Sequence, residues 1–94
     1  MHIRRIIWLP DIVEKNDRKH GVDPWEVEEV LSGWVTARKV ARGRVQGEDV
    51  YLVLGQSQSG RYLSVFFILK SDGVVLPISA RDMDRKERKL YGRL

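Results

Sequence analysis

The sequence contains no cysteine, only two histidines and only three prolines among its 94 residues. Without thiols, the chain can form neither disulfides nor thiolate-based catalytic or metal sites. Its histidines, His2 and His20, are too few to build a histidine-ligated metal centre. No glycine-rich phosphate loop is present, because the glycines fall at predicted turns and helix ends. The chemistry open to this chain is therefore that of its charged, polar and aromatic side chains.

Long apolar runs are also missing. No segment approaches the roughly eighteen apolar residues that a membrane span requires. The apolar run within residues 1–8 is too short for a signal peptide. We therefore expect a soluble, cytoplasmic protein with no membrane contact. The length predicts a single domain over residues 1–94 with a modest core.

The charge of the chain is unevenly distributed. There are 17 basic and 13 acidic residues, a formal net charge of +4. Arg38, Lys39, Arg42 and Arg44 form a basic stretch without an acid, and the region from Arg81 onward adds six basic residues against three acidic ones. This excess favours polyanionic partners, although the same residues also suit a solvated surface.

Hydrophobic periodicity predicts the element order β-α-α-β-β-β-β-α. Strands are predicted over 3–8, 35–45, 50–56, 61–70 and 74–81. Helices are predicted from Pro10 to a stop at Gly21 and from a cap at Asp23, with Glu26 at the third position, to a stop at Gly33. A third helix is predicted to start at the capping box formed by Asp84 and Glu87. The segment 61–70 is apolar on both faces and belongs in the middle of the sheet, while 35–45 is polar and suits an edge.

These elements predict the fold class α+β, with an antiparallel sheet of about four to five strands and helices packed on one of its faces. The first helix presents Leu9, Ile12 and Val13 to the core, and the same stripe continues through Asn16 and His20. The stripe of the second helix is Val27, Val30, Leu31 and Trp34.

Two arginines are predicted at the same end of the sheet. If the segments before and after the turn at Asp72 pair, Tyr62 lies roughly opposite Asp82, so Arg61 and Arg81 come close. Arg88 and Tyr91 add a cation and an aromatic ring from the last helix. Arginines grip phosphates and aromatic rings stack on unpaired bases, so such a cluster suits RNA. The alternative is a set of ion pairs with the nearby acids, Asp82, Asp84 and Glu87.

A second candidate lies at the corner formed by Lys19, His20, Gly21 and Val22. A protonated His20 would be favoured at a helix C-terminus by the helix dipole. The alternative is that His20 packs at the corner between two helices. Asn16, one turn earlier, is interpreted as a buried, hydrogen-bonded amide.

Taken together, these motifs resemble the BrnT toxin family over nearly the whole chain. The family pattern has a tryptophan, an asparagine eight residues later, Lys-His-Gly-Val, and a C-terminal Ser-Ala-Arg followed six residues later by Glu-Arg-x-x-Tyr. This sequence matches it at Trp8, Asn16, Lys19-His20-Gly21-Val22, Ser79-Ala80-Arg81, Glu87-Arg88 and Tyr91.

The resemblance implies a ribonuclease toxin of a type II toxin–antitoxin system, with a RelE-like fold. It implies metal-independent RNA cleavage with no cofactor, and a small ribbon-helix-helix (BrnA-like) antitoxin as partner. The resemblance is compatible with both a homodimer and a toxin–antitoxin hetero-oligomer. It also implies residue roles: the scissile phosphate held by Arg61 and Arg81, acid–base chemistry by Lys19 or His20, and RNA binding by Arg85, Arg88 and Tyr91.

Three positions depart from the family pattern. The aspartate after the tryptophan, the lysine before the asparagine and the lysine after Ser-Ala-Arg are replaced by Leu9, Ile12 and Asp82. These changes keep open an alternative function, a catalytically weakened or inactive RNA- or protein-binding module of the same fold. A structural oligomerisation domain is a third interpretation, suggested by the doubly apolar segment 61–70.

Overall fold

The computed structural model describes residues 1–43 and 45–94, and it has the predicted element order. The elements are β1 (Arg5–Ile6), α1 (Pro10–His20), α2 (Pro24–Val30), β2 (Ala37–Ala41), β3 (Val50–Gln56), β4 (Tyr62–Ser71), β5 (Val74–Asp82) and α3 (Arg85–Tyr91). Among the described residues, no helix is long and apolar enough to cross a membrane.

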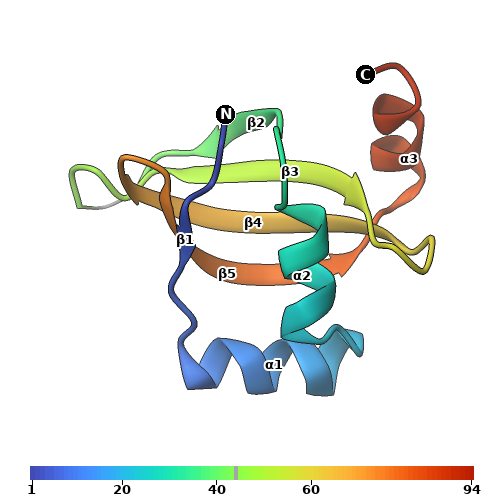
Figure 1. Ribbon diagram of the computed structural model, residues 1–94, viewed down its shortest axis with the longest axis horizontal. Coiled ribbons are helices and arrows are strands. Elements are labelled where there is room, and N and C mark those ends of the chain that lie inside the picture. The colour runs from blue at the N-terminus through green and yellow to red at the C-terminus, as the bar shows by residue number, and fades with distance from the viewer. Residues whose placement is uncertain (44) are drawn as a thin grey trace.

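The strands form a mixed five-stranded sheet in the order β1-β5-β4-β3-β2 (Figure 1). Strands β2 to β5 are an antiparallel meander, and β4 lies in its middle as predicted. The predicted edge strand is β2. The departure from a purely antiparallel sheet is β1, which pairs with β5 in parallel over only Arg5 and Ile6.

The core lies between one face of the sheet and helices α1 and α2. On β4 the alternate residues Leu63, Val65 and Phe67 have no exposed surface, and they cluster with Val22 and Val27 from the helical layer. This is the period of two that places every second strand residue on the same face. The core is therefore formed by the central strand β4 and by the α1–α2 corner that packs against it.

Close packing of α2 on β3 depends on a glycine. A Cβ atom at Gly55 would lie 2.7 Å from Cγ1 of Val30, which is shorter than real contacts allow. The absence of a side chain at this position lets the helix approach the strand directly. The capping box of Asp23 and Glu26 is present at the start of α2, where Glu26 Oε1 accepts a hydrogen bond from the backbone N–H of Asp23.

Helix α3 lies on the opposite face of the sheet, at one end (Figure 1). Ser64 alternates with the core residues of β4, and its hydroxyl donates to Glu87 of α3. The expectation that all helices cover one face is therefore wrong for α3. The reason is that the chain leaves β5 next to Arg81, which pairs with Ser64 and faces away from the core.

The exposed edge of β5 is covered by helix α1. Asn16 is 2% exposed, and its Oδ1 accepts a hydrogen bond from the backbone N–H of Ala80. Lys15 Nζ donates to the carbonyl oxygen of Ile78. The interpretation of Asn16 as a buried, hydrogen-bonded amide is confirmed, and these two side chains satisfy edge groups that would otherwise be open to another strand.

Several boundaries differ from the prediction. Helix α2 ends at Val30, so Trp34 leaves the buried stripe and is 78% exposed. Leu9, expected on the core stripe of α1, is 42% exposed and precedes the helix. The predicted strand 35–45 is realised over Ala37–Ala41. Its residue Arg44 lies outside the described part of the chain.

Candidate functional site

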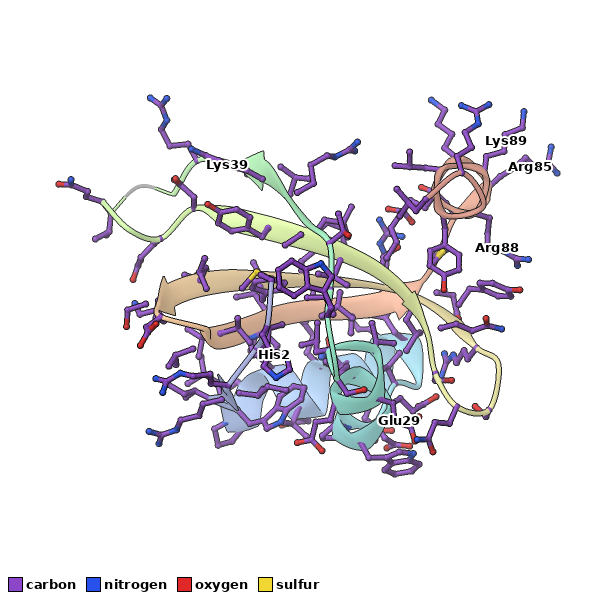
Figure 2. All side chains as sticks on the ribbon, turned by 45° about the horizontal axis from the view of Figure 1, so that its top comes forward. His2, Glu29, Lys39, Arg85, Arg88 and Lys89 are labelled. Atoms are coloured by element: carbon purple, nitrogen blue, oxygen red, sulfur yellow. The ribbon has the colours of Figure 1, made fainter. Side chains whose placement is uncertain are left out.

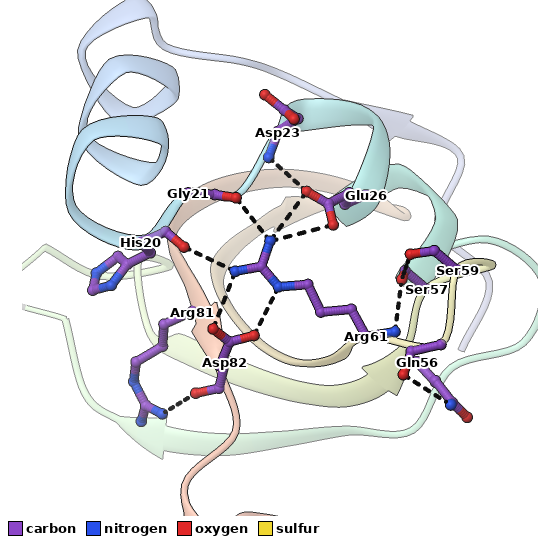
Figure 3. A network of polar contacts seen from close by, with 11 residues as sticks. His20, Gly21, Asp23, Glu26, Gln56, Ser57, Ser59, Arg61, Arg81 and Asp82 are labelled. Carbon is purple, nitrogen blue, oxygen red and sulfur yellow. Dashed lines mark hydrogen bonds and ion pairs between the residues drawn. The ribbon is translucent and has the colours of Figure 1, made fainter.

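Arg61 is the centre of a polar network where β4 begins and β5 ends (Figure 3). Its Nε donates to Asp82 Oδ1 at 2.7 Å, and one Nη2 bond reaches Asp82 Oδ2 at 3.1 Å. The same Nη2 donates to the carbonyl oxygen of His20, while Nη1 donates to that of Gly21 and to Glu26. Every nitrogen of the guanidinium is therefore engaged, and the network joins α1, α2, β4 and β5.

Arg61 and Asp82 each shift the pKa of the other. The hydrogen bond from Arg61 lowers the pKa of Asp82, and the charges of Arg61 and of nearby His20 lower it further. The same bond to Asp82 is the main cause of a raised pKa at Arg61. Both groups thus stay charged over the whole physiological range, and the pair forms a fixed dipole at the end of the sheet.

Arg81 forms the second pair at this end of the sheet. Its Nη1 and Nη2 donate to Glu87 Oε1 and Oε2 at 2.7 and 2.9 Å, and Glu87 also accepts from the hydroxyl of Ser64. The hydrogen bond to Glu87 raises the pKa of Arg81. Glu87 and Asp84 also form the predicted capping box, so this ion pair joins β5 to the first turn of α3.

The two arginines lie at the same end of the sheet, as predicted, but on opposite faces. The register pairs Leu63 with Asp82 and Ser64 with Arg81. Asp82 and Arg61 therefore lie on the core-facing side, while Arg81 lies on the α3 side. The observed partner of Asp82 is one residue beyond the predicted Tyr62, because the turn is centred between Asp72 and Gly73 rather than on Asp72: Ser71 pairs with Val74, and the two register irregularities farther along the strands cancel. Both arginines form the ion pairs of the alternative interpretation: Arg61 pairs with Asp82, and Arg81 pairs with Glu87.

An aromatic cluster lies beside Arg81 on the α3 side. The guanidinium carbon of Arg88 lies 3.6 Å from the ring centroid of Tyr62, and the rings of Tyr62 and Tyr91 meet edge to face at 5.9 Å. Tyr62 was missed from the sequence as a site residue. The signal was available, since Tyr62 and Ser64 are two positions apart on β4 and so share the face that α3 covers.

The other predicted residues surround this end of the sheet. His20 is half-buried at the end of α1, where its carbonyl oxygen accepts a hydrogen bond from Arg61 while its imidazole points outward from the network (Figure 3). Lys19 is exposed and has no hydrogen bond or ion pair to any described residue. Arg85 and Arg88 are exposed on α3, with Lys89 (Figure 2). The predicted residues thus form two groups on either side of the end of β5. The corner group is Lys19, His20 and Arg61, and the α3 group is Arg81, Arg85, Arg88 and Tyr91.

Comparison with known proteins identifies the family. A sequence model described as the ribonuclease toxin, BrnT, of type II toxin–antitoxin systems matches residues 8–87. The chain belongs to the BrnT family. As a BrnT-family protein it is a ribonuclease toxin of a type II toxin–antitoxin system, a class that implies an antitoxin partner and an RNA target. No match was found among curated proteins.

A solved BrnT structure shares the fold. The crystal structure of the Brucella abortus ribonuclease toxin BrnT matches with a TM-score of 0.61 at 22% sequence identity, covering 86% of this chain and 97% of that chain. Within the BrnT fold, the α+β class predicted from the sequence is confirmed. The BrnT motifs that are distant in sequence, at the α1–α2 corner and at the β5–α3 connection, come together at one end of the sheet.

Proposed function

We propose that this BrnT-family protein cleaves RNA at the end of β5, without a metal ion. The observation that supports this is that Arg61 binds both the exposed Asp82 and the backbone of His20, at the same end of the sheet as the cations and aromatic rings of α3. Cleavage needs no nucleophile from the protein because RNA carries its own. The protein has to position the backbone, stabilise charge and move protons.

The proposed reaction is an internal transfer of the phosphodiester. The 2′-oxygen attacks the adjacent phosphorus and forms a P–O2′ bond, while the P–O5′ bond breaks. A base takes the proton of the 2′-hydroxyl and an acid gives a proton to the leaving O5′, so that the products are a 2′,3′-cyclic phosphate and a 5′-hydroxyl. We assign this proton transfer to His20, with exposed Lys19 as the second candidate.

The remaining residues bind and stabilise the RNA. Arg61 faces the phosphate from the core side of the strand end, and Arg81 supplies positive charge from the α3 side. Arg88, Arg85 and Tyr91 bind the flanking nucleotides, Arg88 and Arg85 through phosphates and Tyr91 by stacking. The separation of the two groups by the end of β5 suits a strand of RNA that crosses this end of the sheet.

The partners follow from the toxin class. We propose a small ribbon-helix-helix antitoxin that neutralises the toxin and, bound to it, binds the DNA of its operon. We also propose that the toxin acts in the cytoplasm, where its RNA target is found. Sedimentation of the toxin alone and with its antitoxin distinguishes a homodimer from a hetero-oligomer.

The test is RNA cleavage and growth arrest on induced expression. His20→Ala is expected to reduce the cleavage rate by about 10²- to 10⁴-fold, the usual contribution of a general acid or base. The chain offers a matched control, because His2 lies away from the site in a bridge with Trp34. His2→Ala is expected to cleave like the wild type. A wild-type toxin that neither cuts RNA nor slows growth contradicts the proposal, while a His20→Ala variant that cuts at full rate contradicts the assignment of His20.

A second function is a non-catalytic RNA- or protein-binding module of the same fold. The observation that favours it is the neutralisation of both site arginines, Arg61 by Asp82 and Arg81 by Glu87. RNA binding at full strength with no cleavage, and no effect of His20→Ala, would support this second function over the first.

A further inference from the structure

The guanidinium of Arg61 has an inner and an outer edge. On the inner side, Nη1 donates to the carbonyl oxygen of Gly21 at 2.7 Å and to Glu26 at 3.4 Å, and Nη2 donates to that of His20 at 2.9 Å. These partners belong to the α1–α2 corner and to α2. They hold the plane of the guanidinium in place whether or not an anion is bound outside.

The outer edge, formed by Nε and Nη2, is occupied by Asp82. Two carboxylate oxygens accept from two parallel donors at 2.7 and 3.1 Å, which is the bidentate arrangement that arginine also forms with two oxygens of a phosphate. The side chain of Asp82 is 63% exposed, whereas that of Arg61 is 27% exposed. The carboxylate therefore lies on the solvent side, where a ligand would arrive.

The surroundings of this carboxylate are those of a phosphate site. The charge of His20 contributes to lowering the pKa of Asp82, although its imidazole points outward from the network in Figure 3. Arg81 Nη1 donates to the backbone carbonyl oxygen of Asp82 at 3.2 Å. Asp82 also follows Arg81 directly in β5. An anion in place of this carboxylate would therefore meet the outer edge of Arg61, beside the chain at Arg81 and in the field of His20.

We propose that Asp82 occupies the place of the scissile phosphate on Arg61 and acts as an internal competitor of RNA. The proposal rests on the proposed function, in which Arg61 faces the phosphate. RNA must then displace the carboxylate, which swings into solvent, and the free toxin is held in an inhibited state by its own residue. The contact weakens substrate binding without altering the groups that carry out the reaction.

Glu87 is not a second competitor of this kind. Its side chain is 14% exposed, and besides Arg81 it accepts hydrogen bonds from the hydroxyl of Ser64 and the backbone N–H of Asp84. Displacing it would disrupt the first turn of α3. Among the described side chains, the carboxylate of Asp82 has no donor other than Arg61, so its release breaks only the two hydrogen bonds of this pair. The hydrogen bond from Arg81 goes to the backbone carbonyl oxygen of Asp82 and does not hold the carboxylate.

The experiment measures binding of a 2′-deoxy oligonucleotide, which has phosphates but cannot react through a 2′-hydroxyl. Asp82→Asn keeps the shape of the side chain and removes its charge. We expect it to bind about five- to tenfold more tightly than the wild type at about 0.1 M salt, because the exposed charge-assisted pair no longer competes. In RNA cleavage, KM should fall by a similar factor while kcat changes little.

Asp72→Asn is the matched control. Asp72 is an exposed aspartate in the turn before β5, at the opposite end of the strand from Asp82, and its substitution changes the net charge equally. We expect its affinity to stay within about twofold of the wild type, since distant exposed charges are screened. Asp82→Ala, with a circular dichroism melt, repeats the test if Asp82→Asn folds poorly.

Equal affinities for Asp82→Asn and Asp72→Asn would overturn the proposal, because the effect would then be one of net charge alone. If Asp82→Asn binds more tightly but neither it nor the wild type cleaves RNA, the proposal that Asp82 competes with RNA stands and the proposed nuclease function is rejected. The binding and cleavage readouts thus separate the failure of one proposal from that of the other.

Discussion

Single side chains decide how the edge of this sheet is closed. Asn16 is predictable from the sequence as a polar residue on the stripe of α1, and burial with one hydrogen bond is the common state of such an amide. Its partner is not predictable, because the backbone N–H of Ala80 is 64 residues away in the chain. The contact depends on β5 being next to α1, which only the assembled sheet determines.

We expect Asn16→Ala to lower the free energy of unfolding by about 1–3 kcal/mol. The substitution leaves the N–H of the fully buried Ala80 without its acceptor, and an unpaired buried donor costs this much. Urea denaturation at neutral pH measures the change. Asp17→Ala, at an exposed position one residue further on, is expected to stay within about 0.5 kcal/mol of the wild type. A similar small effect for Asn16→Ala would show that the hydrogen bond contributes little.

The same limit applies to the residues of the site. The sequence places Arg61 and Arg81 at one end of the sheet because they lie at nearly equal distances before and after the hairpin turn at Asp72. It does not tell which acid each arginine meets, since Asp82, Asp84 and Glu87 are all within reach along the chain. The alternation of β5 decides this, by directing Arg81 to the α3 side and Asp82 to the other side.

For helix α3, the sequence predicts the first residue correctly but not the face of the sheet on which the helix packs. Its start at the Asp84–Glu87 capping box is local and was correct. Its packing against the far face of the sheet is tertiary, and a seven-residue helix with mostly charged side chains has no apolar stripe from which to predict that face. The ion pair between Arg81 and Glu87 provides that attachment.

The attachment of α3 should depend on pH. Burial raises the pKa of Glu87, but the hydrogen bonds from Arg81, Asp84 and Ser64 outweigh it, so the net pKa is lowered. A carboxyl whose pKa is lower in the folded state contributes stability above its unfolded pKa, of about 4.3, and loses it as the pH falls through the folded pKa. The stabilising effect of Glu87 is therefore fully present at neutral pH.

Glu87→Gln tests this dependence. We expect the variant to be less stable than the wild type by about 1–3 kcal/mol at pH 7, because Arg81 loses its charged partner. The difference should shrink as the pH falls below about 4, where the wild-type carboxyl also becomes neutral. Urea denaturation from pH 7 to pH 3 measures both variants. A difference that stays constant with pH would show that the charge of Glu87 does not hold α3.

At the scale of the whole molecule, the two ends of the sheet carry separate groups of charged side chains. The end of β5 carries the site and α3, whose exposed cations include Arg85, Arg88 and Lys89 (Figure 2). The other end of the sheet carries the pair of Arg4 and Asp72. The sequence predicted the basic C-terminal region, but the joining of this region to the Lys19–His20 corner is a result of the fold, with Arg61 as the link.

This separation predicts which cations contribute to RNA affinity. Binding that releases counterions weakens with salt, and each phosphate contact on a single strand contributes about 0.7 to the slope of log affinity against log salt. We expect Arg88→Gln to reduce that slope by about this amount, because Arg88 lies at the site end. Arg4→Gln removes the same charge at the far end, next to Asp72, and is expected to leave the slope unchanged. Fluorescence anisotropy with a 2′-deoxy oligonucleotide over a range of salt concentrations measures both slopes. Equal losses for the two variants would mean that RNA follows the net charge of the molecule rather than the end of the sheet where its two motifs meet.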